Sequence, residues 1–396
     1  MEKLKTEKNI RYGKVGDKEK AKKIWKKCFL DSDEEIEFYF ENLYKDENLV
    51  ILEENGVMKS CMHENKYNLI VNRNEIPSFF IVGVGVLPEY RNKGCMDKLI
   101  RFSMMGAKEN GYDFVYLHPV NSEIYSRYGF SYVSDIENYS FYGKDIPFDK
   151  IEKSYQIKEI DENNMDEYLE DCIDIYNFKM KSFFMYVQRD REKFRNLFLE
   201  VFSDKGEVYI FYEEEIPKGY LILYKNENKI ILRELFAKNG KTVKNILAFI
   251  KSFKDYYQEI NLKAPIRENM NLYFPNQNLI KKESTSYIMG RILNPLAILK
   301  KVINLNSVFK IKIIDNVILE NTGIYIVKNG EVNFVRDGNC DLEIDIEDFA
   351  QLVFGYMEID ELDFLDKIIY KDKEILEKFK KKCKFKILKN YFFDYQ

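Results

Sequence analysis

Apolar positions along the first third of this chain alternate between two patterns, a period of two and a period of three to four residues. The period-two runs predict strands at residues 10–12, 48–53, 59–69, 79–87 and 112–117. The longer period predicts helices at residues 17–28, with Asp17 as the cap, and at 35–43, 94–108 and 122–128. This alternation predicts a mixed-sheet α/β domain.

The second stretch, residues 151–289, repeats much of that order. Its predicted strands are 155–160, 208–212, 220–224, 230–236 and 259–264, and its predicted helices are 164–178, 189–202 and 243–253. No sequence period links the two stretches, so only the order of elements is repeated. This predicts a duplicated α/β unit.

The third stretch begins at Gly290 and has a different order. Its predicted strands are 309–314, 324–327 and 332–335, and its predicted helices are 346–354 and 371–381. We therefore expect a separate α+β domain, and a division of the chain into residues 1–150, 151–289 and 290–396.

Composition limits the class of protein. The chain has 396 residues, of which 45% are hydrophobic and 32% charged, with a formal net charge of -4. A balance of this kind lacks the basic character of nucleic-acid binding proteins. The longest apolar run, 79–87, is too short to span a bilayer, and the start, MEKLKTEKNIRYG, has no apolar signal region. Six scattered cysteines favour reduced thiols, so we expect a cytoplasmic protein without membrane or nucleic-acid partners.

The segment from Phe79 to Leu99 is the most informative. Val84 and Val86 of the predicted strand point to one face, while Gly83 and Gly85 point to the other and permit the close approach of a backbone or a ligand. The helix that follows starts near Gly94. Its free N–H groups and dipole favour a pyrophosphate, and Arg91 and Lys93 add positive charge. Taken alone, an ordinary strand–turn–helix explains the segment equally well.

A second motif about thirty residues later changes that balance. With Tyr125-Ser126-Arg127-Tyr128-Gly129-Phe130 in place after a strand and an Asn, the chain resembles the GNAT acetyltransferases, whose signatures are [RQ]-x-x-G-x-[GA] and Y-x-x-x-G-F. It departs from the first signature at Met96. The resemblance implies acetyl-CoA as cosubstrate and no metal. The implied cofactor-binding residues are Val84, Gly85, Val86, Arg91, Asn92, Lys93, Gly94, Cys95, Met96, Asp97 and Asn121.

Over its whole length the chain is similar to the bacterial Eis (enhanced intracellular survival) family. That family joins a catalytic GNAT domain, a second GNAT-like domain without a cofactor motif, and a domain similar to sterol carrier proteins. The second stretch here likewise lacks the phosphate-binding motif between Phe236 and Val243. The resemblance implies N-acetylation of primary amines on a polycationic, aminoglycoside-like molecule, and a homo-oligomer, specifically a hexamer.

The resemblance also suggests catalytic roles. Tyr125 matches the general acid, and its phenol, with an ordinary pKa of ~10, keeps its proton at neutral pH; simple packing is the alternative. The family's base is the C-terminal carboxylate, which by position is that of Gln396. The backbone N–H of Val84 is expected to face the thioester oxygen. For His118 we favour a structural role over that of a base, and for Cys95 a role of its backbone.

Two further function classes stay open. A protein lysine acetyltransferase would need an open groove, and a non-catalytic protein would bind coenzyme A or a lipid without turnover. An acidic run could line a cleft for a cationic substrate, although a solvated helix face is the favoured interpretation. The acidic residues are Asp31, Asp33, Glu34, Glu35 and Glu37.

Overall fold

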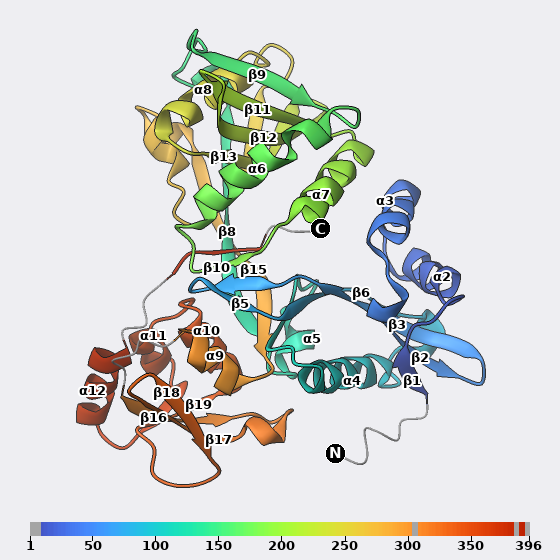
Figure 1. Ribbon diagram of the computed structural model, residues 1–396, viewed down its shortest axis with the longest axis vertical. Coiled ribbons are helices and arrows are strands. Elements are labelled where there is room, and N and C mark those ends of the chain that lie inside the picture. The colour runs from blue at the N-terminus through green and yellow to red at the C-terminus, as the bar shows by residue number, and fades with distance from the viewer. Residues whose placement is uncertain (1–8, 303–307, 384–387, 393–396) are drawn as a thin grey trace. The chain divides into compact units, whose positions relative to one another are not determined.

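The computed structural model describes residues 9–302, 308–383 and 388–392, and Figure 1 shows its ribbon. Its residues form two compact units. Unit 1 consists of Met1–Ser134, Phe184–Gln188 and Tyr287–Leu388, and unit 2 of Asp135–Phe183, Arg189–Ser286 and Lys389–Gln396. Two strands, β8 (Ser131–Tyr142) and β15 (Lys281–Ile292), contribute residues to both units. The three-way division made from the sequence stays a prediction.

The larger sheet of unit 1 has the strand order β1-β2-β3-β6-β7-β15. Strands β1 to β6 pair antiparallel, β7 is parallel to β6, and β15 is antiparallel to β7. Their bounds are β1 Ile10–Tyr12, β2 Leu49–Glu54, β3 Val57–Lys66, β6 Ser78–Val86 and β7 Phe114–Leu117. A smaller sheet contains β4 (Leu69–Val71), β5 (Asn74–Ile76) and β10 (Met185–Val187).

Helices cover both faces of that sheet because its strands are apolar on both sides. The helices are α2 (Lys18–Cys28), α3 (Asp33–Phe38), α4 (Cys95–Glu109) and α5 (Ser122–Ser126). Along β2, Leu49 and Ile51 pack in the cluster of α2 and α3, while Val50 and Leu52 pack in the cluster of α4. The predicted mixed α/β class is therefore confirmed.

Two local predictions need correction. Asp17 precedes α2, but its carboxylate does not cap the helix; it binds the guanidinium of Arg11 at 2.6 Å instead. The helix predicted at 35–43 is α3 followed by a π-helical turn, Tyr39–Leu43. It starts earlier than predicted because Ser32 and Glu35 form a capping box.

Unit 2 repeats the architecture with its sheet in the order β8-β14-β13-β12-β11-β9. Strand β14 is parallel to β13, and the other neighbours pair antiparallel. The strands are β9 Tyr155–Ile160, β11 Glu207–Glu213, β12 Ile216–Asn226, β13 Lys229–Ala237 and β14 Glu259–Pro265, and the helices are α6 Met165–Met180, α7 Arg191–Ser203 and α8 Gly240–Lys251. Each unit thus completes its sheet with a strand that enters from the other half of the sequence.

The third stretch, in unit 1, folds around a sheet of order β18-β17-β16-β19-β20. Its strands are β16 Phe309–Ile314, β17 Gly323–Lys328, β18 Glu331–Val335, β19 Leu342–Asp345 and β20 Ile368–Tyr370, and its helices are α9 Pro295–Val302, α10 Ile346–Val353, α11 Ile359–Phe364 and α12 Lys373–Cys383. The α+β prediction is confirmed, although α9, β19, α11 and β20 were missed.

No helix within the described ranges is both long enough and apolar enough to cross a membrane. The cysteines at positions 28, 61, 95, 172 and 340 are free thiols.

Candidate active site

The parallel strands β6 and β7 separate halfway along β6. Their pairing runs from Ser78 opposite Phe114 to Ile81 opposite Leu117 and goes no further. Strand β6 continues to Val86, still paired with β3 on its other edge. Residues 82–86 therefore present one backbone edge that β7 no longer covers, and this edge can hydrogen-bond an extended ligand.

A bulge decides which groups lie on that edge. The register between β3 and β6 slips by one residue around Gly83, whose φ is +61°. Beyond the bulge, the N–H of Leu87 donates to the Lys59 carbonyl on β3, at 3.0 Å. Because N–H groups alternate between the edges of a strand, those of Val86 and Val84 point to the uncovered side.

The next element is the N-terminus of α4. Gly94 occupies the N-cap with φ +74°, and its carbonyl accepts the first intrahelical bond, from the N–H of Lys98 at 3.1 Å. The N–H groups of residues 95–97 therefore have no intrahelical partner. A Cβ on Gly94 would meet nothing within 4 Å. Glycine therefore serves the positive φ at this position.

The turn before α4 is exposed and basic. The Arg91 Nε donates to the Val86 carbonyl at 3.3 Å, and Lys93 Nζ donates to the Glu89 carbonyl at 2.9 Å. Asn92 takes a left-handed φ of +60°. Both cations therefore flank the helix N-terminus, where they reinforce its positive end.

The two strand glycines have a different role from a ligand contact. A Cβ on Gly83 would lie 2.5 Å from Cζ3 of Trp25, and one on Gly85 would lie 2.7 Å from Cγ2 of Ile24. The close approach predicted from the glycines is thus made by side chains of α2. The uncovered edge of residues 82–86 is a different surface of the strand, because it is formed by backbone groups and not by the face on which these glycines lie.

Tyr125 lies in α5, whose N-cap Asn121 accepts the Glu123 N–H at 2.9 Å. The Tyr125 side chain is 8% exposed and belongs to the core cluster against which Val84 and Val86 pack. Burial raises the pKa of this phenol above its ordinary value. The Tyr125 phenol therefore stays protonated at neutral pH.

The other candidates have structural explanations. The His118 ring packs against Tyr287, with centroids 4.6 Å apart. In the acidic run, Asp31 accepts a hydrogen bond from Trp25 Nε1 at 2.6 Å, and Asp33 accepts one from Lys26 at 2.5 Å. These pairs favour the helix-face interpretation. No group of three or more His, Cys, Asp or Glu side chains within the described residues could hold a metal.

Two buried titratable residues on β3 were not predicted as candidates. His63 is 1% exposed, surrounded by aromatic rings, and neither ring nitrogen has a hydrogen-bond partner among the described residues. Burial lowers its pKa to about 3. Burial also raises the pKa of Glu64, to about 7. Polar residues within an apolar strand were the available signal.

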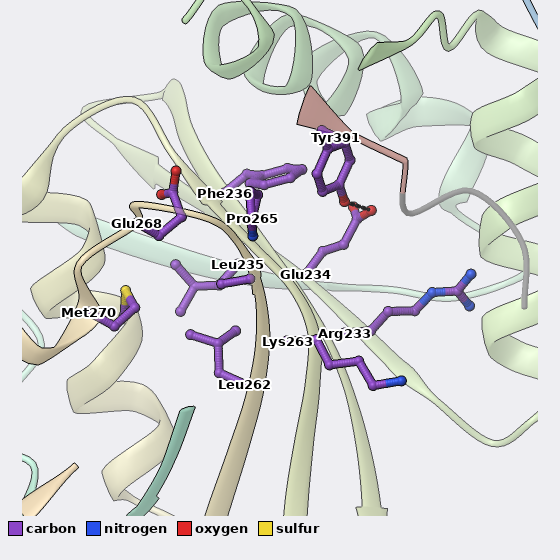
Figure 2. Close-up of a pocket in the computed structure, with 11 residues that line it drawn as sticks. Arg233, Glu234, Leu235, Phe236, Leu262, Lys263, Pro265, Glu268, Met270 and Tyr391 are labelled. Carbon is purple, nitrogen blue, oxygen red and sulfur yellow. Dashed lines mark hydrogen bonds between the residues drawn. The ribbon is translucent and has the colours of Figure 1, made fainter. Parts of the chain in front are cut away.

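Unit 2 contains a second opening of the same form. Strands β13 and β14 pair in parallel only as far as Leu232 opposite Leu262, and the register between β12 and β13 then slips around Arg233. Figure 2 shows a pocket lined by both strands beyond this point and by Tyr391, whose hydroxyl donates to Glu234 at 2.6 Å.

A buried ion pair lies next to this second opening. Both nitrogens of the Arg189 fork donate to the Glu234 carboxylate, at 2.6 and 3.0 Å, and Tyr220 donates to it at 2.7 Å. The Arg189 and Glu234 side chains are 0% exposed. With Tyr391, which also contacts Glu234, they occupy the region beyond the last parallel pair of β13 and β14.

Comparisons with known proteins agree with this architecture. Residues 9–133 match a family model described as an acetyltransferase (GNAT) domain, residues 185–292 match a second model of that description, and residues 294–382 match the sterol carrier protein domain. The chain is therefore an enzyme of the GNAT acetyltransferase class, with two GNAT domains and a C-terminal sterol carrier protein domain. Among curated protein sequences, none matches the chain.

Solved structures share the fold over nearly the whole chain. A GCN5-related N-acetyltransferase from Anabaena variabilis is 17% identical, with a TM-score of 0.83 and 98% of this chain and 99% of that chain covered. A probable N-acyltransferase from Enterococcus faecalis is 18% identical, with a TM-score of 0.84 and coverages of 96% and 98%. Eis1 from Mycobacterium abscessus is 14% identical, with a TM-score of 0.77 and coverages of 94% and 96%.

Proposed function

We propose that this enzyme transfers the acetyl group of acetyl-CoA to primary amines of a polycationic small molecule of the aminoglycoside kind. The transfer is direct, within a ternary complex. The observation that carries the proposal is the uncovered edge of β6 beside the uncapped N-terminus of α4. This combination offers hydrogen bonds to an extended arm and a positive site for a diphosphate.

The residues present fit acetyl-CoA, which supplies an acetyl group activated as a thioester. The N–H groups of Val84 and Val86 would bind the pantetheine arm, with Gly85 between them. The diphosphate would lie against Arg91 to Asp97, a segment that includes Asn92, Lys93, Gly94, Cys95 and Met96. Asn121 would act at the rim of the site through the helix that it caps.

The chain's own groups can balance the reaction. The amine nitrogen bonds to the carbonyl carbon of the acetyl group as the carbon–sulfur bond breaks. The N–H of Val84 stabilises the negative charge that develops on the thioester carbonyl oxygen. Tyr125 gives its phenolic proton to the departing sulfur. The carboxylate of Gln396, a position outside the described residues, takes the amine's proton, and solvent returns one to the phenolate.

The resemblance to the Eis family supports the rest of the proposal. The chain would assemble as a hexamer in the cytoplasm, with no metal and no nucleic-acid or membrane partner. The second GNAT domain would bind no cofactor, since Tyr391 and the Arg189–Glu234 pair lie beyond the last parallel pair of its strands and would compete there with a pantetheine arm. The mass of the particle in solution, measured by mass photometry, tests the assembly.

The activity is tested by following release of coenzyme A thiol with three amine classes: aminoglycosides, polyamines and lysine peptides. Turnover with the polycationic small molecules is the expected result. Turnover with lysine peptides alone would instead establish a protein lysine acetyltransferase. Absence of thiol release with every amine, together with a lipid retained in native mass spectrometry, would establish a binding protein.

A further inference from the structure

Arg291, on β15, is a fully buried cation that links the first domain to the third. Its side chain is 0% exposed, as is that of Asp315, whose two carboxylate oxygens accept from Nη2 at 2.6 and 2.7 Å. The remaining donors turn toward backbone: Nε donates to the Tyr128 carbonyl at 2.9 Å, and Nη1 donates to the Ile292 carbonyl. One guanidinium thus joins a third-domain carboxylate to the loop after α5.

That loop directly follows the proposed acid, Tyr125, which lies in the last turn of α5. The Tyr128 N–H donates to the Tyr125 carbonyl at 2.9 Å, so the carbonyl that Arg291 holds belongs to the turn that ends α5. Gly129 follows with φ +78°, and a Cβ there would lie 2.8 Å from Arg291 Nε. The glycine of the Y-x-x-x-G-F motif therefore serves both the turn and the passage of this guanidinium.

Asp315 is itself fixed by the third domain. It lies just after β16, and one of its carboxylate oxygens also accepts the N–H groups of Val317 and Ile318, at 3.0 and 2.9 Å. The other oxygen accepts from Asn321 Nδ2 at 2.8 Å. A carboxylate held by this many donors is a rigid anchor for Arg291.

Helix α10 of the third domain holds the first two residues of β8, which follow that loop directly. The Ser131 hydroxyl donates to the Glu347 carbonyl at 2.7 Å, and Gln351 Nε2 donates to the Tyr132 carbonyl at 3.3 Å. The segment from Tyr125 to Tyr132 is therefore supported at two points by the third domain.

We infer that Arg291 is a positioning residue for the acetyl transfer: with Asp315 it fixes the end of α5, and so the direction of the Tyr125 hydroxyl. The inference rests on the proposed function, since it assumes that Tyr125 is the acid. It gives the third domain a role in catalysis that needs no ligand of its own. An acid displaced by about 1 Å loses on the order of 100-fold in rate, while binding of both substrates is preserved.

The test compares the full chain with Arg291→Lys and with the double variant Arg291→Met/Asp315→Asn. Lysine keeps the charge but cannot hold a carboxylate and a carbonyl at once in a planar fork. The double variant leaves no unpaired buried charge. For both we expect kcat to fall by about 10- to 100-fold with little change in either KM, and unchanged acetyl-CoA binding by calorimetry. In a Tyr125→Phe background the same changes should have almost no further effect.

A matched control uses another ion pair between the same two domains. Lys301 binds Asp113 at 3.0 Å without touching the loop, so Lys301→Met/Asp113→Asn should leave kcat unchanged. Two results would overturn this inference and leave the proposed function standing. In the first, Arg291→Lys folds and keeps the wild-type kcat. In the second, the fold-changes in kcat caused by Arg291→Lys and by Tyr125→Phe multiply in the combined variant, as they do for independent residues. If the wild-type chain shows no turnover, or if Tyr125→Phe leaves kcat unchanged, both the proposed acid and this inference are overturned.

Discussion

Gly94 offers the sharpest test of the proposed cofactor site. Gly94→Glu adds a negative charge where the diphosphate is proposed to bind, and no neighbour within 4 Å obstructs the new side chain. Two unit charges about 6 Å apart interact with roughly 3 kcal/mol at an effective dielectric constant of about 20, and physiological salt halves this to about 1.3 kcal/mol. Against two phosphate charges the loss is about 2.6 kcal/mol, so Kd should rise roughly 80-fold.

The same helix provides the control. Gly111, just past the end of α4, has φ +83° and equally open surroundings. Gly111→Glu should therefore carry the same backbone strain, about 1–2 kcal/mol, without touching the cofactor site. Calorimetric titration with acetyl-CoA should give a higher Kd for Gly94→Glu than for Gly111→Glu, and this difference should decrease as the salt concentration rises. Gly94→Ala should bind acetyl-CoA almost as tightly as the wild type. Equal affinities for the two glutamate variants would refute the site.

Three other predictions address the acid and the two buried networks. Tyr125→Phe should lower kcat by about 100-fold, and since burial raises this pKa the wild-type rate should not fall until above the ordinary phenol range; unchanged turnover at every pH would disprove the role. Arg189→Met leaves Glu234 charged and buried, so the free energy of unfolding in urea should fall by about 3–5 kcal/mol, and more than in Arg189→Met/Glu234→Leu. The folded pKa of His63 lies near 3, below its unfolded value of 6.5, so folding favours the neutral ring and stability should fall as pH drops below about 6.5. His63→Phe should lose less stability between pH 7 and 4, and parallel losses would contradict this account.

Local patterns predicted most individual elements. The helix expected at 94–108 is Cys95–Glu109, and the strand at 79–87 is Ser78–Val86. Both have long apolar stripes and clear stops, at Pro88 and at a glycine. Some short elements, such as β19 and α11, were missed because they contain too few positions to show a period.

Periodicity could not predict that each unit completes its sheet with a strand from the other half of the sequence. Neither β8 nor β15 was predicted as a strand, and even where alternating apolar residues indicate a strand they carry no information about which strand it pairs with. Strand β15 joins β7 in unit 1, where Gly290 fits against the Phe114 ring, and β8 joins β14 in unit 2. Pairing of this kind depends on contacts more than a hundred residues apart along the chain.

The site was predictable where a motif fixes the backbone and not where side chains meet across the fold. The strand–turn–helix around Arg91–Met96 was predicted from the apolar pattern, and Tyr125 was singled out by its match to the GNAT motif. The ion pairs of Arg291 and Glu234 could not be predicted in this way, because their partners, Asp315 and Arg189, lie in other parts of the fold. A buried charge in a strand signals a partner but does not identify it.

The two GNAT domains show how one backbone geometry can be used in two ways. Both have a parallel pair that separates and a bulge directly after the last pair, but their helices begin differently. At α4 the N-cap is Gly94, which has no side chain to satisfy the first-turn amides. At α8 the N-cap is Asn239, whose side chain accepts the Thr242 N–H at 2.8 Å and the Thr242 hydroxyl at 3.0 Å. A phosphate at the N-terminus of α8 would have to displace these hydrogen bonds, and the arm of the cofactor would have to displace Tyr391 from the opening between the strands. The second domain would therefore lose contacts of its own before it gained any from a cofactor.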